Sequence, residues 1–467
     1  MINRLLSHSM AKPIAVCLAL GGLSLLLPSE PSYDPWAWMV WGREVAHLGL
    51  DTNGGPSFKP LPVFVMAIFS PFSKLNDGIP PDLWLVIARA GGLLALYMAF
   101  RLAARLAGGP RAVRYGAGVL AAVALLLTPL WVRYMAHGNE APIAIFFLLW
   151  GIERHLDAKR NQALILGFLA CLLRPEVAPF VGVYGAYLFW TAPELRKLAV
   201  GLGIALPILW LVPEWIGSGN PLGAGKKATG EPPWSLSLRD KPWLAALERA
   251  HALLGLGLEL GVVAAVALAV RARQKPVLWL TGAAAAWVSL IVVMTELGFS
   301  GNSRYFLVPL AIACVVGAAG AGKLVSLAPR LPAQVAVAVL ILVGAGLYVS
   351  PRLGRIEGQA NSINRLVQLQ NELGTSVDRA GGPDAVTRGS FPTVNRGFVT
   401  RMAWEAKVSI GDVEAASGEG AIFAARSRYA GKPPKQIRDL RQQLRFRQGR
   451  WRVYMPRGAS VASTPAP

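Results

Sequence analysis

Two acidic residues stand just after apolar runs of this sequence, and cations are spaced along the same connecting segments. Asp34 follows the first apolar run among three tryptophans, and Glu140 follows the third run. A carboxylate held among aromatic rings at a bilayer surface is partly desolvated, so it holds a proton more readily and suits general-base work. Cations nearby would stabilise a departing phosphate, and the candidates are Lys59, Arg133, Arg174 and Arg304. These residues predict transfer from a lipid-linked phosphate donor to a hydroxyl acceptor.

Four further residues near these charges are candidates for contact with a substrate. Trp36, Trp38 and Glu44 follow the first acid on a helix-like stretch, and Asn220 lies in a Gly-Asn-Pro-Leu turn. Tryptophans at the end of a membrane span are also typical of an interfacial belt, which needs no catalytic function. That alternative accounts for the tryptophans but not for the acid beside them.

The candidate cations have structural alternatives as well. Lys59 fits a Gly- and Pro-rich loop, and Arg174 fits an internal ion pair with Glu176, because ionisable groups at membrane depth are usually functional or mutually paired. Arg304 stands at the non-cytoplasmic end of a predicted span, where the positive-inside rule does not explain an arginine. We therefore expect Arg304 to have an anionic partner. His137 has no neighbour at metal-ligand spacing and is interpreted as an interfacial hydrogen-bonding residue.

The three cysteines of the chain give no sign of a metal site or a disulfide. Cys17, Cys171 and Cys314 each fall inside an apolar stretch, far apart and without metal-ligand spacing. Buried, reduced packing residues are therefore predicted at all three positions. The sequence identifies no metal ligand.

The elements that must position the candidate residues are membrane helices. Of the 467 residues, 54% are hydrophobic and only 16% charged, which is too little polar surface for a water-soluble core. The apolar runs approach twenty residues and lack a two-residue alternation, so they predict spanning helices rather than barrel strands. The predicted fold is mainly α, a polytopic bundle of about eleven spans within residues 1–350. The runs are 13–28, 83–104, 115–132, 141–156, 162–175, 177–191, 198–215, 247–270, 276–297, 304–322 and 331–350.

The basic residues predict which side of the membrane each loop faces. If the N-terminus is cytoplasmic, every predicted cytoplasmic loop is basic, as the positive-inside rule requires. The candidate residues then lie in or beside the outer loops 29–80, 133–140, 174–176, 214–243 and 298–303. A short apolar run at 61–74, framed by prolines, is predicted to be a re-entrant or interfacial helix on that outer face. The formal charge of +21 thus marks sidedness and does not indicate a nucleic-acid partner.

Hydropathy falls after residue 350, and an odd number of spans places the C-terminal segment outside. Residues 351–467 predict a small extracytoplasmic α+β domain that ends in a disordered tail. They hold nineteen Lys and Arg against nine Asp and Glu, which favours attraction to anionic membrane lipids over a platform for an acidic glycan. High Ala, Gly and Arg usage indicates a GC-rich bacterial genome and hence a plasma membrane.

The order of these motifs resembles the GT-C superfamily of polytopic glycosyltransferases, which use polyprenyl-phosphate sugars as donors. The first-loop acid Asp34, the turn Lys59-Pro60-Leu61-Pro62, a span opening near Arg89 and the second acid Glu140 occur in the family's order. The segments Leu-Leu-Arg-Pro-Glu, Gly-Asn-Pro-Leu and Ser-Arg-Tyr-Phe-Leu-Val-Pro are also similar to those of bacterial members. The resemblance covers roughly residues 13–350.

The resemblance implies an inverting-type transfer at the outer leaflet. In it Asp34 is the general base, Glu140 orients the acceptor or a divalent cation, and Lys59 and Arg304 bind the donor phosphate. This sequence departs from the family's pattern because the second acid is Glu where Asp is common, and because proline, not a second acid, follows Asp34. A divalent cation is therefore allowed but not required. The implied acceptor is an envelope glycan, lipid or protein, and arabinofuranose and mannose both remain open as the sugar.

Two other classes of protein compete with the enzyme. One is a transporter or flippase of a lipid-linked envelope precursor, which predicts ionisable residues buried in the middle of spans and paired broken helices. Here most candidate charges lie at span ends on one face, which favours the enzyme. The other is a non-catalytic assembly protein of the envelope, for which loss of Asp34 would leave function unchanged.

Overall fold

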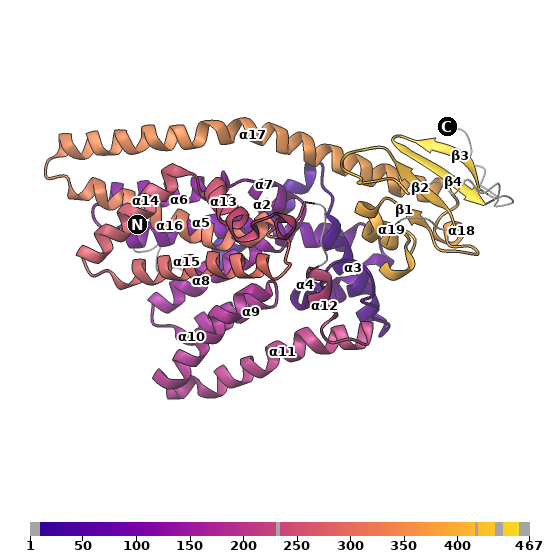
Figure 1. The fold of residues 1–467 in the computed structure, drawn as a ribbon, viewed down its shortest axis with the longest axis horizontal. Coiled ribbons are helices and arrows are strands. Elements are labelled where there is room, and N and C mark those ends of the chain that lie inside the picture. The colour runs from indigo at the N-terminus through magenta and orange to yellow at the C-terminus, as the bar shows by residue number, and fades with distance from the viewer. Residues whose placement is uncertain (1–9, 230–233, 416–418, 435–441, 457–467) are drawn as a thin grey trace.

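Helices make up most of the molecule, and a small sheet lies at one end of it (Figure 1). The computed structural model describes residues 10–229, 234–415, 419–434 and 442–456. The mainly α fold with a small C-terminal sheet that the sequence predicts is confirmed. The predicted disordered tail lies outside the described residues.

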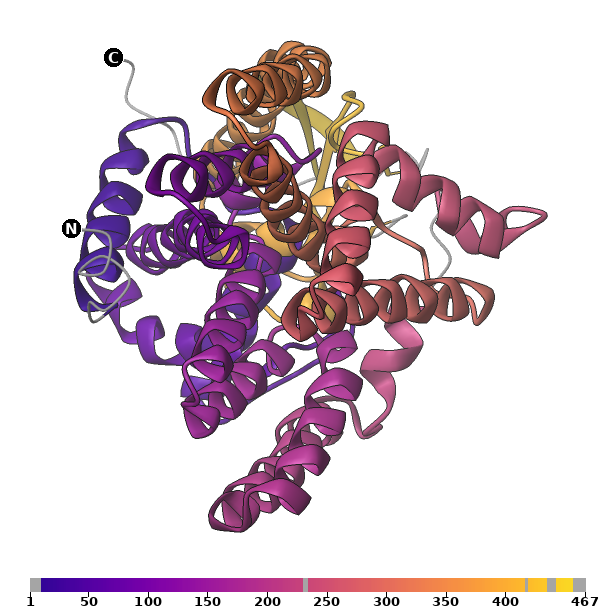
Figure 2. The same ribbon diagram turned by 90° about the vertical axis from the view of Figure 1, so that its left-hand side faces the viewer.

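The first half of the chain is mainly helical, and most of its longer helices overlap the predicted apolar runs. The α-helices are α2 (Ala11–Leu23), α3 (Tyr33–Ala46), α4 (Pro60–Phe69), α5 (Ile79–Ala107), α6 (Arg111–Leu126), α7 (Trp131–Ala136), α8 (Ala141–Leu156), α9 (Arg160–Cys171), α10 (Ala178–Thr191), α11 (Arg196–Ser218) and α12 (Gly223–Ala228). The 3-10 turns are η1 (Ser24–Leu26), η2 (Ser70–Lys74), η3 (Pro175–Val177) and η4 (Pro193–Leu195). The end view shows α10 and α11 projecting away from the main bundle (Figure 2).

The second half places one helix at the centre of the bundle and one along its side. The α-helices are α13 (Pro242–Leu254), α14 (Leu256–Arg271), α15 (Lys275–Glu296), α16 (Leu307–Leu327), α17 (Leu331–Arg379), α18 (Pro383–Val386) and α19 (Val399–Glu405). The 3-10 turns are η5 (Leu236–Leu238), η6 (Ser303–Phe306), η7 (Arg396–Phe398) and η8 (Ile410–Asp412). Most of α16 is buried, packed against α5, α6 and α14. All three cysteines are buried and unpaired, as predicted.

Five of the described helices are long and apolar enough to cross a membrane. They are α5, α11 with η4, α15, α16 with η6, and α17, and each overlaps a predicted span. The hydrocarbon core is about 30 Å thick, which takes about twenty helical residues, so the ten-residue α4 is too short to cross it. The helices are those of a multi-pass membrane protein. The remaining runs form shorter or bent helices, and the number eleven stays a prediction.

The run at 247–270 differs from the single straight span that the sequence predicts. The helices α13 and α14 meet at Gly255 with a bend of 90°. Gly255 has φ +76°, and a Cβ atom there would lie 3.0 Å from the guanidinium of Arg352. That guanidinium donates to the Leu253 carbonyl at 3.5 Å, one of the groups that the end of α13 leaves without a helical partner. A distant arginine thus supports a bend that the apolar pattern of the segment does not reveal.

The helix α17 joins the bundle to the sheet and runs along the length of the molecule (Figure 1). It has 49 residues and contains Pro351 in its interior. The boundary predicted at residue 350 therefore falls inside one continuous helix. The division into a 1–350 and a 351–467 domain stays a prediction, and the helix connects the two parts without a linker.

The C-terminal sheet has four strands in the order β1-β2-β4-β3. The strands are β1 (Thr393–Val394), β2 (Ile422–Ala425), β3 (Gln442–Gln448) and β4 (Trp451–Pro456). β1 and β2 are parallel and the other pairs are antiparallel. A two-residue loop joins β3 to β4, with Gly449 at φ +54° where only glycine is unstrained. Alternate residues of β4 are buried, and the Trp451 indole donates to the Leu369 carbonyl of α17 at 2.9 Å.

The tryptophans of α3 lie inside the protein rather than in an interfacial belt. Trp36, Trp38 and Trp41 are each at most 2% exposed. They belong to one hydrophobic core with residues of α17, α19 and the sheet, Leu369 and Met402 among them. The first predicted outer loop and the C-terminal part of the chain are therefore packed as one unit. This packing fixes the position of Asp34, two residues before Trp36.

Candidate active site

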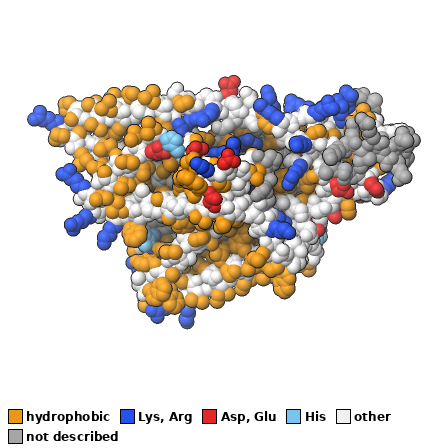
Figure 3. Space-filling model, in the orientation of Figure 1, with side chains coloured by type: hydrophobic (Ala, Val, Ile, Leu, Met, Phe, Trp, Pro, Cys, Tyr) orange, Lys and Arg blue, Asp and Glu red, His pale blue; other side chains and the backbone are white. Residues whose placement is uncertain are grey.

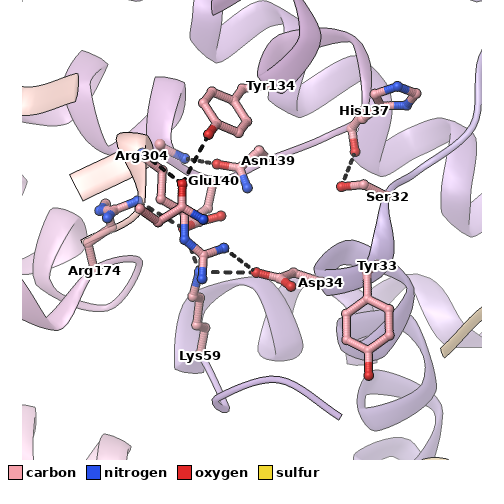
Figure 4. Close-up of polar contacts among 12 residues, drawn as sticks. Ser32, Tyr33, Asp34, Lys59, Tyr134, His137, Asn139, Glu140, Arg174 and Arg304 are labelled. Atoms are coloured by element: carbon pink, nitrogen blue, oxygen red, sulfur yellow. Dashed lines mark hydrogen bonds and ion pairs between the residues drawn. The ribbon is translucent and has the colours of Figure 1, made fainter. Parts of the chain in front are cut away.

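Asp34 lies in the first turn of α3, where a carboxylate interacts favourably with the helix dipole. The start of that helix is tied to the loop after α7, because the Ser32 amide donates to the His137 carbonyl at 3.0 Å. The buried tryptophans that come next prevent α3 from turning. Asp34 is thus held facing the segment that carries Glu140 (Figure 4).

Lys59 precedes α4 in extended backbone, and Pro60 occupies the first helical position. Proline is well suited to that position because it has no amide hydrogen to leave unpaired. The Leu61 amide then donates to the Leu172 carbonyl at 3.3 Å, which ties this turn to the end of α9. The Lys59 ammonium lies 5.2 Å from the ring centroid of Trp38, so the side chain passes over an aromatic face.

Glu140, Arg174 and Arg304 come from three other breaks between helices. Glu140 directly precedes α8, whose first amide is capped by the Asn139 side chain at 3.1 Å. Arg174 stands in extended backbone before Pro175, which ends the preceding helix. Arg304 is the second residue of the turn η6, where the Asn302 side chain accepts from its amide at 3.2 Å. Each residue is placed by a cap or a proline, so its position depends on local sequence as well as on packing.

These residues form one network of ion pairs (Figure 4). Arg304 Nη1 lies 2.6 Å from Asp34 Oδ2, and Lys59 Nζ lies 2.5 Å from Glu140 Oε1. Lys59 Nζ also lies 4.0 Å from Asp34 Oδ2, and Arg174 Nη1 lies 3.3 Å from Glu140 Oε1. Arg174 Nη2 lies 3.2 Å from Glu176 Oε1, which is the internal ion pair considered for this arginine. We call the set Asp34, Lys59, Glu140, Arg174, Glu176 and Arg304 the charged cluster. It holds three carboxylates and three cations, so its charges balance.

Burial differs across the charged cluster. The side chain of Glu140 is 0% exposed, whereas those of Asp34 and Arg304 are 15% and 26% exposed. Burial alone raises the pKa of Glu140, but the charges of Lys59, Arg174 and Arg304 outweigh it and lower the pKa to about 2. Glu140 is therefore ionised at neutral pH. The open side of the cluster, where a substrate can approach, is the Asp34 and Arg304 side.

Several buried polar atoms of the charged cluster have no hydrogen-bond partner among the described residues. They are Glu140 Oε2, Arg174 Nε and Glu176 Oε2. Buried polar groups in folded proteins nearly always have a partner, so these atoms call for water or for a bound polar molecule. A polar molecule could therefore donate to the two carboxylate oxygens or accept from Arg174 Nε without any change in the ion pairs.

The structure brings five of the six predicted catalytic and phosphate-binding residues into contact with at least one other of them. These are Asp34, Lys59, Glu140, Arg174 and Arg304. The exception is Arg133, which instead lines a separate pocket beside α17. The roles assigned to all six stay predictions.

The four predicted substrate-binding residues lie outside the charged cluster or beneath it. The Trp36 indole donates to Gln370 of α17 at 2.5 Å, and Trp38 lies under the Lys59 ammonium. Glu44 accepts from the Asp51 amide and from the Ser409 hydroxyl. Asn220 is exposed and accepts from the Leu222 amide within its own turn. Each therefore has a structural role, and its contact with a substrate stays a prediction.

Two residues of the site carry less signal in the sequence. Tyr305 lies under both arginines, with its ring centroid 5.5 Å from the Arg174 guanidinium and 5.8 Å from that of Arg304. The Tyr134 hydroxyl lies 3.5 Å from the Asn302 side chain that caps η6. Tyr305 is next to Arg304 in the chain, so the Ser-Arg-Tyr-Phe segment could have indicated it. Nothing in the sequence around Tyr134 relates it to residue 302.

The carboxylates of the charged cluster do not form a metal site. Among the described residues no group of three His, Cys, Asp or Glu side chains is arranged to hold a metal ion. Both acids proposed for catalysis are already paired with Lys59, Arg174 or Arg304, and cations repel a divalent ion. The divalent cation that the family resemblance allows does not fit these residues as they are paired here.

Comparisons with known proteins identify the fold. No protein-family model and no curated protein matches the sequence. The crystal structure of ArnT from Cupriavidus metallidurans bound to undecaprenyl phosphate is similar, with a TM-score of 0.55 and 15% identity over 98% of this chain and 99% of that chain. The apo state of the same protein gives a TM-score of 0.54 and 14% identity, covering 95% of this chain and 97% of that one. The fold that the family resemblance implies is confirmed, because this chain shares the fold of ArnT over nearly the whole length of both chains.

Proposed function

We propose that this protein is a membrane glycosyltransferase that moves a sugar from a polyprenyl-phosphate donor to an acceptor in the cell envelope, on the extracytoplasmic face. The acceptor is a glycan, lipid or protein with a free hydroxyl group. Undecaprenyl phosphate, which the similar ArnT structure holds, is a polyprenyl phosphate and corresponds to the lipid part of the proposed donor. The fold supports the class of enzyme, and the charged cluster supports the chemistry.

The observation that carries the proposal is the contact between Asp34 and Arg304. These residues are 270 positions apart, yet their charged groups lie 2.6 Å apart on the accessible side of the cluster. A carboxylate that binds an arginine so closely has one oxygen engaged and is a poorer proton acceptor. An incoming phosphate offers Arg304 another anion, and the exchange would leave Asp34 available as a base.

The reaction depends on this exchange. Arg304, supported by Lys59, binds the donor phosphate and stabilises the negative charge that grows on it. The acceptor hydroxyl gives its proton to Asp34, and its oxygen forms a bond to the anomeric carbon. The bond between that carbon and the phosphate oxygen breaks, and the oxygen keeps the electron pair as polyprenyl phosphate leaves. Direct displacement of this kind inverts the anomeric configuration.

Glu140 acts in this proposal as a positioning residue. Its side chain is fully buried, so it does not face an incoming substrate. It holds Lys59 at 2.5 Å and Arg174 at 3.3 Å, and without it two cations would repel each other in a buried place. Preorganised cations stabilise developing charge without moving at the moment of reaction.

The test is transfer of a radiolabelled sugar from a panel of polyprenyl-phosphate donors to envelope acceptors in membranes. Wild type is compared with Asp34→Asn at matched expression. Asp77→Asn is the matched control, because Asp77 is an exposed aspartate of the same predicted outer loop, 29–80. Asp77 pairs with Lys407 and is not part of the charged cluster. We expect transfer with wild type and with the control, and its loss with Asp34→Asn.

The other outcomes point elsewhere. Transfer that survives Asp34→Asn at the wild-type rate would contradict the assignment of the base. The absence of transfer from every donor, with a correctly folded wild-type protein, would count against the enzyme and in favour of a transporter or an assembly protein.

A further inference from the structure

A second group of cations surrounds a pocket of about 280 Å³ between α7 and α17. We call it the arginine pocket. It is lined by Arg133, Arg352, Arg355, Gln359, Ser362, Gly358, Leu127, Pro129 and Leu130. The α17 residues lie at spacings of three and four, so they share one face of that helix. None of these described lining residues is an Asp or a Glu.

The arginine pocket lies where α17 leaves its apolar stretch. Residues of that stretch are strongly exposed, Leu340 at 70% and Leu347 at 74%. On a membrane helix, exposed leucines face lipid, so the arginines that come after them stand near the boundary between hydrocarbon and headgroups. Figure 3 shows hydrophobic side chains over the helical part and Lys and Arg gathered toward the sheet end of α17.

The cations of the arginine pocket lack anionic partners within the described part of the chain. The side chains of Arg133 and Arg355 make no hydrogen bond or ion pair with any described residue, and the Arg133 carbonyl accepts only the helical bond from the His137 amide. Arg352 donates to the carbonyls of Tyr348 and Leu253, and its buried Nε has no partner among those residues. No described carboxylate neutralises these three positive charges, so the pocket favours an anionic ligand.

The rest of the lining is apolar. Leu127, Pro129 and Leu130 belong to the break between α6 and α7 and form the opposite wall. A free anion in water would gain nothing from that wall. A lipid places a phosphate and an adjoining hydrocarbon chain side by side, and so fits both parts of the pocket.

We propose that the arginine pocket binds the phosphate of a membrane lipid at a site separate from the charged cluster. A phosphate monoester fits best, because it carries a charge of about −1.5 to −2 at neutral pH and three acceptor oxygens, which match three guanidinium groups. The site does not depend on the proposed transfer reaction.

The two sites share one short helix. Arg133 and Tyr134 are neighbours on the six-residue α7, and Tyr134 reaches Asn302, which caps the turn that carries Arg304. Arg133 faces the other site. A lipid phosphate in the arginine pocket would therefore lie next to the catalytic side of the molecule without occupying it, as a membrane-anchored second substrate or a bound headgroup would.

The test uses the full chain in detergent micelles and counts bound lipid by native mass spectrometry. The probe is dioleoyl phosphatidic acid, and dioleoyl phosphatidylcholine has the same chains without a net charge. The variant is Arg133→Gln with Arg355→Gln, and Arg365→Gln is the matched control, an exposed arginine of α17 outside the pocket. Melting temperature checks that each variant is folded.

We expect wild type and the control to bind one phosphatidic acid, and the double variant to bind it about tenfold more weakly or worse. Equal binding by the double variant, an equal loss in the control, or equal binding of phosphatidylcholine would each contradict the proposal. Competition separates the sources. Undecaprenyl phosphate is itself a lipid phosphate monoester and can compete at either site, so a variant of the charged cluster separates them. Loss of phosphatidic acid binding in folded Arg304→Gln would identify the charged cluster as the single site and overturn the proposal. Displacement by millimolar inorganic phosphate would show a site for free anions and not for a lipid.

Discussion

The charged cluster and the arginine pocket each contain three cations, but among the described residues counterions accompany only the first three. In the charged cluster Asp34, Glu140 and Glu176 neutralise the cations within the fold, and Glu140 does so without any exposure. In the arginine pocket no Asp or Glu is among the described lining residues, and the side chains of Arg133 and Arg355 have no such partner in the described part of the chain. An anion can therefore bind to a cation of the charged cluster only by replacing a carboxylate. An anion that binds in the arginine pocket replaces nothing and supplies a counterion that the pocket lacks.

Exchange also explains how the charged cluster could be selective. An anion that merely adds to the network must compete with a carboxylate already 2.6 Å from Arg304. A donor phosphate also competes with the Asp34 carboxylate for Arg304, but the displaced carboxylate then gains a new partner, the acceptor hydroxyl. Because no carboxylate or histidine is among the described residues that line the arginine pocket, it can bind a phosphate but has no base to take a proton from an acceptor.

The largest expected effect tests the exchange itself. Arg304→Gln removes the guanidinium that is proposed to leave Asp34 and bind the donor phosphate. We expect the rate of sugar transfer to fall about a hundredfold to a thousandfold. The double variant with Asp34→Asn should lose little more than the worse single variant, because both act in one step. Transfer rates in membranes measure both. Losses that multiply fully would show that the two residues act independently.

The next effect is on stability and separates the two regions directly. Glu140→Gln removes the buried counterion of Lys59 and Arg174, and breaking a buried pair costs about 3–5 kcal/mol. We expect a large fall in melting temperature in detergent. The surface variant Asp77→Asn should change it little. A Glu140→Gln protein as stable as wild type would show that water already screens this part of the charged cluster.

The sequence predicts the partners in the charged cluster better than it predicts their surroundings. Acids and cations at span ends on one face implied a common site, and five of the six candidates are in contact. Arg133 stands in the same kind of segment but lines the pocket beside α17. On the short helix α7, neighbouring residues point in different directions, so a shift of one position decides which site a side chain faces. Local sequence does not record that rotation.

Other features depended on long-range packing and were not predictable. The tryptophans of α3 have the sequence pattern of an interfacial belt, but the C-terminal part of the chain covers them, as Trp36 and Gln370 show. The bend at Gly255 is supported by Arg352, about a hundred residues away. The apolar runs and the mainly α fold were predictable because they depend on local composition.

A smaller effect concerns the segment that joins the two regions. Burial lowers the pKa of His137 to about 4, a hydrogen bond to the Glu30 carbonyl opposes this, and the charges of Arg133 and Arg89 add to it. The unfolded chain takes up a proton near pH 6.5 and the folded one only near pH 4, so this residue lowers stability as pH falls through that window. At pH 5 the loss is about 2 kcal/mol.

The measurement is the melting temperature from pH 8 to pH 5 for wild type and His137→Gln. Wild type should lose more stability than the variant on acidification. Because burial raises the pKa of Glu30 to about 7, that residue makes folding less favourable as pH rises, and only the difference between the two proteins isolates His137. Parallel curves would mean that His137 stays accessible to protons in the folded state.

The smallest expected effect is the change in stability when two arginines of the arginine pocket are replaced, and we predict that this change is close to zero. Arg133→Gln with Arg355→Gln removes two cations that have no partner to lose among the described residues, so without added lipid the free energy of unfolding should change by no more than about 0.5 kcal/mol. Added phosphatidic acid should raise the melting temperature of wild type and not of the double variant, because a ligand that binds only the folded state stabilises it. If the double variant were instead as unstable as Glu140→Gln without lipid, the arginines would have counterions within the protein, and the contrast between the two regions would fail.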